Sequence, residues 1–319
     1  MKNLSNEKIW YFLSIIAFIL ILSCRDSKAV EAFSSEKKIE KITEDKSVNS
    51  KEVKAALSSE FKTYWYAGEA EISSYKLEQA RYGELREGHA VLVFVTEEFL
   101  PNIQVKADQH NPENVPVLKL NATKNFNTGI YPYSIMQSTF YPVSNKQHAL
   151  KISSSIQEWC GHVYAQLNNR NQFEVMSHSY FQNEADNHFK IDKAILENEL
   201  WTQLRINPKS LPTGDIKIIP AFEYTRLKHI PIKAYQASAF LQDNNYTLHY
   251  PELNRTLSIT FNPDFPFEIL SWEETFKSGF GANSKLLTTK ATRLKTIKSA
   301  YWKQNHNENE NLRKTLLLK

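Results

Sequence analysis

Residues 255–261 of this 319-residue chain read Arg255-Thr256-Leu257-Ser258-Ile259-Thr260-Phe261, and apolar side chains alternate with polar ones. Successive side chains of a β-strand point to opposite faces of a sheet, so this alternation predicts a strand buried on one face. The run Ala90-Val91-Leu92-Val93-Phe94-Val95 is apolar throughout, which predicts a strand covered on both faces. Strands of these two kinds indicate a mainly β protein.

Further apolar or alternating runs predict additional strands between turn-forming clusters; they lie at 117–120, 134–141, 149–167, 172–181, 216–224, 232–241, 246–250, 269–276 and 290–302. Two helices are predicted. One is a short amphipathic helix over 55–66, and the other covers Lys193–Arg205, with Asp192 as its cap and Pro208 beyond its end. Strands and helices do not alternate regularly, which argues against a parallel sheet.

The segment 149–167 contains no strong turn signal and is long for a single strand, since strands usually have about 3–10 residues. A long strand that curls around a lumen accounts for this length. The predicted fold is therefore mainly β (α+β), with a large, strongly curved antiparallel sheet or half-open barrel and one or two helices.

Composition supports a packed core and excludes several classes of protein. Hydrophobic residues make up 41% of the chain and aromatic residues 12%, which is ample for a folded domain. The net charge of +4 is dispersed and is carried mostly by lysine, so no basic stripe predicts nucleic-acid binding. The two cysteines, Cys24 and Cys160, do not make a disulfide scaffold if Cys24 is modified.

The N-terminus has the pattern of an export signal. Lys2 and Lys8 precede an apolar run that ends at Leu22 and is shorter than the ~20 residues of a membrane-spanning helix. Ile21-Leu22-Ser23-Cys24 resembles the bacterial lipobox, which predicts a lipoprotein signal peptide over 1–23 and acylation of Cys24. An ordinary signal peptide or an uncleaved anchor with a chance cysteine is the alternative.

The rest of the chain divides by composition. Residues 24–54 are predicted to be a lipidated cysteine followed by a charged tether, 55–303 the β domain, and 304–319 a polar tail that frays unless Leu316–Leu318 docks back. By resemblance to the bacterial sorting rule, Arg25 after the cysteine favours the outer membrane. The membrane is then a partner through the anchor, with the periplasmic or surface face left open.

The strongest local candidate for chemistry is Glu158-Trp159-Cys160-Gly161-His162. In an unbulged strand Glu158, Cys160 and His162 project from one face, and thiolate, imidazole and carboxylate are zinc ligands. Cysteine beside histidine is also a nucleophile–base pairing. A purely structural interpretation is favoured over both: a buried thiol beside a hydrogen-bonded histidine, with Gly161 at a bulge.

Other candidates carry less weight. His178 and His188 flank the polar loop 183–187, where a metal is one interpretation and a solvated hairpin end another. Acidic residues beside aromatic ones resemble glycan-binding clefts, but they also occur wherever a strand leaves a core; they are Glu69, Glu71, Glu273 and Glu274. No nucleotide-binding, hydrolase-elbow or calcium-loop motif appears, so no cofactor is predicted.

Three stretches carry a family resemblance: 75–88, which reads YKLEQARYGELREG, 126–133, which reads FNTGIYPY, and 157–162, which reads QEWCGH. They are similar to an uncharacterised family of Bacteroidota outer-membrane lipoproteins, across nearly all of the mature chain. Members sometimes carry the label septum formation inhibitor Maf. The Ser-Pro-Arg-Arg signature of true Maf pyrophosphatases is absent here, so the resemblance implies an envelope location and supplies no mechanism.

The functional hypothesis from sequence is a non-enzymatic envelope lipoprotein whose curved sheet holds an apolar ligand, either a lipid or acyl chain, or binds an envelope partner protein. The first alternative is a hydrolase or zinc-dependent enzyme that uses Cys160, His162 and Glu158. The second is a glycan-binding lipoprotein with Tyr/Trp and Glu surfaces.

Overall fold

The computed structural model describes residues 57–144 and 147–318. The chain divides into two units, Met1–Lys51 and Glu52–Lys319, and all the residues described here belong to the second. This unit contains five clusters of buried apolar side chains, the largest of which joins residues from Phe61 to Ala291. The Glu52–Lys319 unit therefore packs around a core of its own.

The core element is a single sheet, in which 16 strands of the described chain follow the order β10-β11-β12-β13-β14-β15-β16-β1-β2-β4-β5-β6-β7-β8-β9, with β3 beside β2. Strands of the N-terminal half are β1 (Ala70–Arg81), β2 (Glu84–Leu100), β3 (Val105–Lys106), β4 (Val115–Thr128), β5 (Tyr131–Pro142), β6 (Lys151–Glu158), β7 (Gly161–Asn169) and β8 (Phe173–Ser179). Those of the C-terminal half are β9 (Asp186–Ile191), β10 (Ile195–Leu196), β11 (Gly214–Ile219), β12 (Tyr235–Gln242), β13 (Asn245–Tyr250), β14 (Arg255–Phe261), β15 (Ile269–Ser278) and β16 (Lys285–Ser299).

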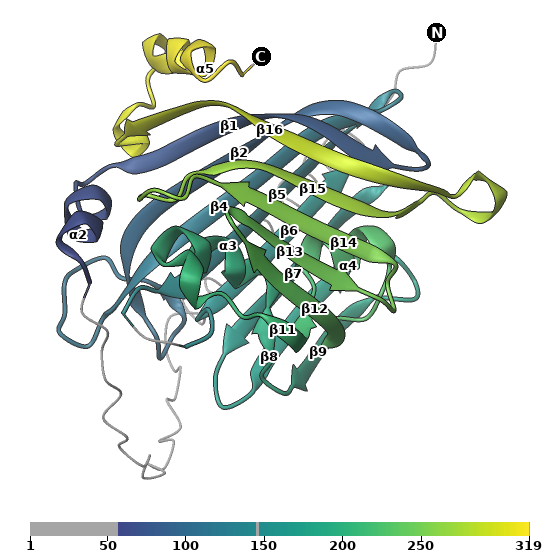
Figure 1. The fold of residues 1–319 in the computed structure, drawn as a ribbon, viewed down its shortest axis with the longest axis horizontal. Helices are drawn as coiled ribbons and strands as arrows, with labels where there is room; N and C mark the ends of the chain where they lie inside the picture. The colour runs from purple at the N-terminus through teal and green to yellow at the C-terminus, as the bar shows by residue number, and fades with distance from the viewer. Residues whose placement is uncertain (1–56, 145–146, 319) are drawn as a thin grey trace, which may run out of the picture. The chain divides into compact units, whose positions relative to one another are not determined.

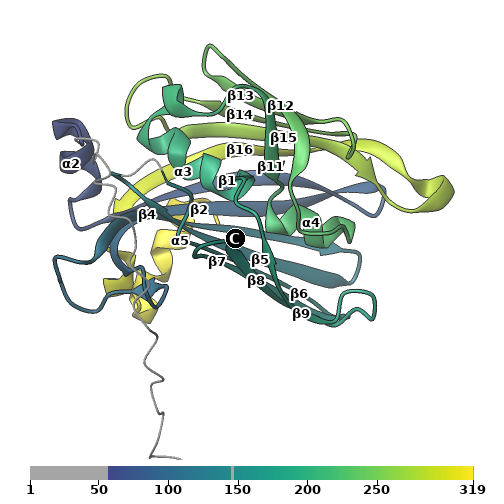
Figure 2. The same cartoon turned by 90° about the horizontal axis from the view of Figure 1, so that it is seen from below.

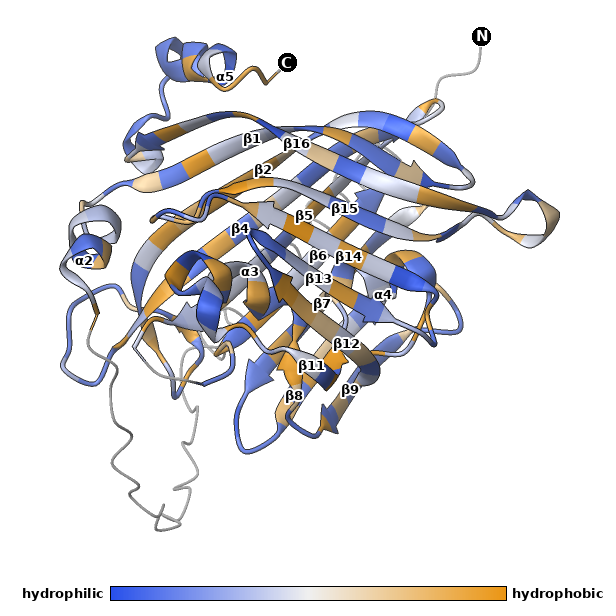
Figure 3. Cartoon of the chain, in the orientation of Figure 1, coloured by the Kyte–Doolittle hydropathy of each residue, from blue (hydrophilic) through white to orange (hydrophobic). Residues whose placement is uncertain are grey.

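The sheet is strongly curved and open, as predicted (Figures 1 and 2). Its two ends are β9 and β10, and every pairing along the order is antiparallel except the two-residue parallel pairing of β10 with β11. Hydrophobic and hydrophilic bands alternate along the strands in Figure 3, as the pattern of 255–261 predicted. In β14 every second residue, from Arg255 to Phe261, is buried.

Four helices of the described chain accompany the sheet, rather than one or two: α2 (Ser59–Trp65), α3 (Glu197–Ile206), α4 (Phe222–Lys228) and α5 (Asn311–Thr315). The predicted N-terminal helix is confirmed as α2, where the Ser58 hydroxyl accepts a hydrogen bond from the Phe61 amide at 3.0 Å and so caps the first turn. Phe61 and Trp65 carry its buried face into the core.

Three element predictions are wrong in their boundaries. The segment 149–167 is not one strand but the hairpin β6–β7, so the premise of a long curling strand fails although the curved sheet is present. The central helix begins at Glu197 instead of Lys193, because Ile195 and Leu196 pair with β11. The predicted strand 216–224 ends at Ile219 and is followed by α4.

The C-terminal segment packs on the sheet. After α5, Leu316 is buried against Ala70, Ile72 and Val95. Its carbonyl accepts a hydrogen bond from the Ser74 hydroxyl at 2.5 Å. Of the two alternatives for the C-terminal tail, frayed or packed back through Leu316–Leu318, the structure has the packed one.

Candidate functional site

A groove lies beside the open seam of the sheet, between strands β7–β9 and the segment 222–232, and we call it the seam groove. It has a volume of about 370 Å³, which is within the range of small-molecule sites. Its floor is formed by buried side chains, namely Val163, Ala165, Phe222 and Thr225. Its walls and rim include Ser177, Ser179, Asn183, Glu184, Asn187, Phe189, Arg226, His229, Ile230, Pro231 and Ile232.

The register of β7 and β8 determines which strand side chains line the seam groove. Val163 and Ala165 on β7 pair with Ser179 and Ser177 on β8, so an apolar pair lies beside a pair of small hydroxyl side chains. Small serines leave space where larger side chains would fill the groove. Phe189 on β9, at the edge of the sheet, completes this wall.

The opposite wall is helix α4, whose first backbone amides are held by side chains of the interior. The Asn198 carboxamide oxygen accepts from the Phe222 amide at 3.2 Å, and that of Gln137 accepts from the Glu223 amide at 3.1 Å. These bonds satisfy donors that a helix N-terminus otherwise leaves unpaired. They fix Phe222 in the floor of the seam groove.

One end of the seam groove is polar. The Glu184 carboxylate accepts from the Ser179 hydroxyl at 2.5 Å and lies 2.5 Å from His229 Nδ1. The Arg226 guanidinium lies 4.3 Å from the centre of the Phe181 ring, and its Nε is 3.9 Å from Glu184, beyond hydrogen-bonding distance. Burial lowers the pKa of Arg226 from its ordinary value, against the opposing effect of Glu184. Arg226 Nη1 lies 3.3 Å from His229 Nε2, while its Nε has no hydrogen-bond partner among the described residues, so this end presents an incompletely paired cation.

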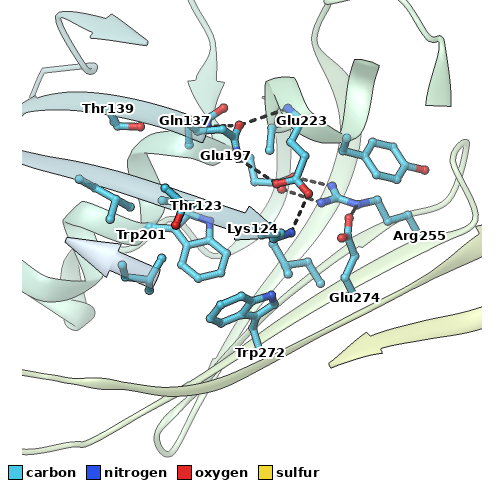
Figure 4. Close-up of a pocket in the computed structure, with 17 residues that line it drawn as sticks. Thr123, Lys124, Gln137, Thr139, Glu197, Trp201, Glu223, Arg255, Trp272 and Glu274 are labelled. Atoms are coloured by element: carbon cyan, nitrogen blue, oxygen red, sulfur yellow. Dashed lines mark hydrogen bonds and ion pairs between the residues drawn. The ribbon is translucent and has the colours of Figure 1, made fainter. Parts of the chain in front are cut away.

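The interior of the curved sheet, in contrast, is nearly full. Figure 4 shows the cavity there, which has a volume of only about 50 Å³. Trp201 of α3 and Trp272 of β15 meet edge to face across it, with ring centres 5.3 Å apart. Space for a few waters cannot hold an acyl chain, so the expectation of an apolar ligand in the lumen does not fit this interior.

Buried ion pairs occupy the rest of the interior. Arg255 binds Glu197 through both terminal nitrogens, at 2.6 Å for Nη2, and Glu274 through Nε at 2.7 Å. Lys124 lies 2.8 Å from Glu223. Burial raises the pKa of Glu223 although Lys124 opposes the shift. This cluster of three carboxylates and two bases positions α3 and α4 inside the sheet, and we assign it a structural role.

A second buried pair joins α3 to β1. Arg205 meets both carboxylate oxygens of Glu71 at 2.6 and 2.7 Å, and Tyr64 donates to Glu71 at 2.5 Å. Burial opposes the ionisation of Glu71, but Arg205 more than offsets it, so the pKa of Glu71 lies below its ordinary value. Glu71 is thus a structural ion-pair partner here, as Glu274 is with Arg255.

Cys160 lies in a turn rather than on a strand face. Trp159 and Cys160 form the turn between β6 and β7, and both are exposed, as is His162. The Glu158 carboxylate accepts from the Cys160 amide at 2.7 Å. The favoured interpretation of a buried thiol is therefore wrong, and the strand geometry that placed Glu158, Cys160 and His162 together does not occur at Cys160.

Cys160 is expected to react slowly with iodoacetamide at pH 7.5, at or below the rate of an unstructured cysteine peptide. The hydrogen bond and negative charge of Glu158 raise the pKa of the Cys160 thiol, and thiolate is the reactive form. Alkylation of residues 52–319, in which Cys160 is the one cysteine, measures this. Glu158→Gln should increase the rate. A rate well above that of the peptide would instead support the cysteine-enzyme alternative.

The remaining sequence candidates are dispersed. The His178 imidazole pairs with Asp186 at 3.2 Å, while His188 lies opposite Met176 on the neighbouring strand. Glu273 pairs with Lys290 on the surface. Among residues 57–144 and 147–318 no three His, Cys, Asp or Glu side chains come together as a metal site.

Cys24, the signal segment 1–23 and the predicted tether 24–54 all fall outside the described residues. In the part of the chain that the structure describes, no helix has the length and apolar character needed to cross a membrane.

Sequence reasoning missed Phe222, Arg226 and His229, because 216–224 was interpreted as a strand. A signal for the helix was present: Pro220 precedes it, Glu223 lies in its first turn, and Arg226 and Lys228 lie in its last. Glu184 was noted only within a polar loop. Nothing in the sequence indicates that this loop meets the end of α4.

Comparison with known proteins identifies no family. No family model matches the chain, and no curated protein matches it. Among solved structures, a β-barrel-like protein of a domain of unknown function, DUF1849, from Brucella abortus is similar with a TM-score of 0.40 and 6% identity, over 72% of this chain and 96% of that one. A porin-like protein from Bacteroides uniformis is similar with a TM-score of 0.21 and 7% identity, over 70% and 95%. Both TM-scores are below 0.5, so the functional argument depends on this chain's own residues.

Proposed function

We propose that this protein is a non-enzymatic, lipid-anchored protein of the cell envelope that binds an acyl chain in the seam groove. The observation that carries the proposal is the groove itself, which has a ligand-sized volume of about 370 Å³, a buried apolar floor and one polar end. Concave sites of this size, mostly apolar with a few convergent polar groups, are the usual form of small-molecule sites.

The chemistry of the groove matches an anionic amphiphile. An acyl chain along Val163, Ala165 and Phe222 would remove apolar surface from water on both sides. A carboxylate or phosphate head at the polar end would meet the Arg226 guanidinium, which Glu184 pairs only at 3.9 Å. The proposed binding site is therefore the seam groove, and not the lumen of the sheet that the sequence suggested.

Anchoring at the envelope is supported by sequence alone. The apolar run ends in Ile21-Leu22-Ser23-Cys24, and an acylated Cys24 would hold the protein at a membrane, with Arg25 favouring the outer one. Metabolic labelling with an alkyne fatty acid tests this: the label should be lost on Cys24→Ser. Retention of label in that variant would refute the anchor.

Saturable binding of a fluorescent long-chain fatty acid by residues 52–319 tests the ligand proposal. We expect one molecule per chain, displaced by unlabelled fatty acid, with a higher melting temperature in the bound form. Binding that does not saturate, together with an unchanged melting temperature across fatty acids and phospholipids, would contradict it.

A further inference from the structure

Five hairpins of the sheet turn at the same end of the molecule, and each presents a large apolar side chain at that end. The hairpins are β15–β16, β1–β2, β4–β5, β6–β7 and β8–β9, seen together at the right of Figure 2. The side chains and their exposed fractions are Phe280 67%, Tyr82 36%, Ile130 82%, Trp159 68% and Tyr180 68%, and we call this set the tip rim. The β13–β14 turn, also at this end, adds no exposed large apolar side chain in the described residues.

The tip rim is continuous from one hairpin to the next. The rings of Tyr82 and Phe280 are 6.2 Å apart, and Trp159 lies 6.4 Å from Tyr131 at the neighbouring turn. Tyr180 covers Gly161 so closely that a Cβ there would meet its ring at 2.9 Å. The Tyr82 hydroxyl lies 2.8 Å from that of Tyr133, whose ring is 6.0 Å from Tyr131, so these contacts connect adjacent turns into one band.

We propose that the tip rim is a membrane-contacting surface that inserts into the interfacial layer of a phospholipid bilayer. Trp and Tyr prefer this layer because their rings are apolar at one end and polar at the other. A connected exposed apolar band is also uncommon on soluble monomers unless it contacts a partner or a membrane. This proposal goes beyond acyl-chain binding and concerns a different set of side chains.

The charges around the tip rim indicate insertion rather than electrostatic adsorption. Acidic and basic residues are mixed there; they are Glu84, Glu158, Glu184, Asp186 and Glu252, with Arg86, Lys228, Lys233, Lys277 and Lys285. A surface balanced in this way lacks the basic cluster that draws proteins to anionic lipids. Apolar side chains therefore supply the attraction, and zwitterionic lipid is a sufficient partner.

Orientation toward a lipid surface rests on the acyl-chain function proposed above: a groove that takes its ligand from a lipid surface should open toward that surface. Two of its rim residues, Asn183 and Glu184, belong to the β8–β9 turn, and His229 follows the end of α4 beside them. The groove thus reaches the same end as the tip rim. The tether does not prevent this orientation, since the 33 residue steps from Cys24 to Leu57 span at most roughly 110–120 Å.

Flotation of residues 52–319 with phosphatidylcholine vesicles tests the proposal. The triple variant Ile130→Ser, Trp159→Ser, Phe280→Ser should reduce the bound fraction at least tenfold. A matched triple variant at exposed apolar positions on strands, Met136→Ser, Met176→Ser, Phe240→Ser, should change it by less than twofold. Raising NaCl from 0.1 to 0.5 M should have little effect. Brominated lipid should quench the tryptophan fluorescence of the parent protein more than that of the triple variant, which lacks Trp159.

Three results would overturn it. They are no flotation of the parent protein, an equal loss in both triple variants, and binding that requires anionic lipid and disappears in high salt. A concentration-dependent dimer that the tip variant abolishes would reassign the tip rim to a second copy of the chain. Fatty-acid binding in solution should persist in the tip variant, so failure here is distinguishable from failure of the proposed function.

Discussion

Replacing Arg255 with methionine is expected to lower the free energy of unfolding by about 3–5 kcal/mol. Arg255 is 2% exposed and is the shared partner of Glu197 and Glu274, both of which are buried. Its loss leaves two buried carboxylates without their cation. Removing one partner of a buried ion pair is costly for this reason.

Urea unfolding of residues 52–319 measures the loss, and an exposed ion pair between β15 and β16 offers a matched control. Glu273 is the neighbour of Glu274 but points outward, where it pairs with Lys290 at 3.0 Å with both side chains about half exposed. Lys290→Met should therefore cost less than about 1 kcal/mol. An Arg255→Met variant within 1 kcal/mol of the parent would show that the cluster does not hold α3 and α4 in place.

Replacing Ser177 with tryptophan should weaken acyl-chain binding at least tenfold while the fold is retained. Ser177 lies on β8, is half-buried and lines the seam groove opposite Ala165. An indole at this position occupies space that the ligand would fill, and tenfold corresponds to about 1.4 kcal/mol. Displacement of a fluorescent fatty acid gives the affinity of parent and variant.

The control for this variant is the next residue along the strand. Met176 is 38% exposed and points to the opposite face of the sheet, so Met176→Trp adds the same side chain away from the groove. Its affinity should stay within twofold of the parent. Equal losses in Ser177→Trp and Met176→Trp would indicate a general disturbance of β8 rather than a filled site.

Elements of this fold could be predicted where the residues of the element itself carry the signal. Alternation along 255–261 identified β14, because inward and outward side chains are visible in the pattern itself. The run at 90–95 identified β2, because a short apolar run rich in valine favours a strand. The β6–β7 turn was missed because Trp159 and Cys160 carry none of the Asn-Gly signals of tight hairpins. The curvature of the sheet was predicted correctly, but from the wrong premise that 149–167 is one long strand.

The candidate site was beyond sequence reasoning for a physical reason. The seam groove joins β7, β8 and β9 to a helix about 40 residues farther along, and only the open edge of the sheet brings them together. Ser177 and Ser179 contribute to the groove by being small, and a small side chain gives no sequence signal of a site. The local pattern that looked most chemical, Glu158 to His162, lies instead at an exposed turn whose Trp159 contributes to the tip rim.

Photo-crosslinking of a diazirine-bearing fatty acid to residues 52–319, with the labelled positions mapped by mass spectrometry, tests the central claim most directly. The account predicts labels in β7, β8 and the segment 222–232, reduced at least tenfold in Ser177→Trp. Labels concentrated on Trp201 and Trp272 in the interior, or spread evenly over the outer face of the sheet, would contradict it.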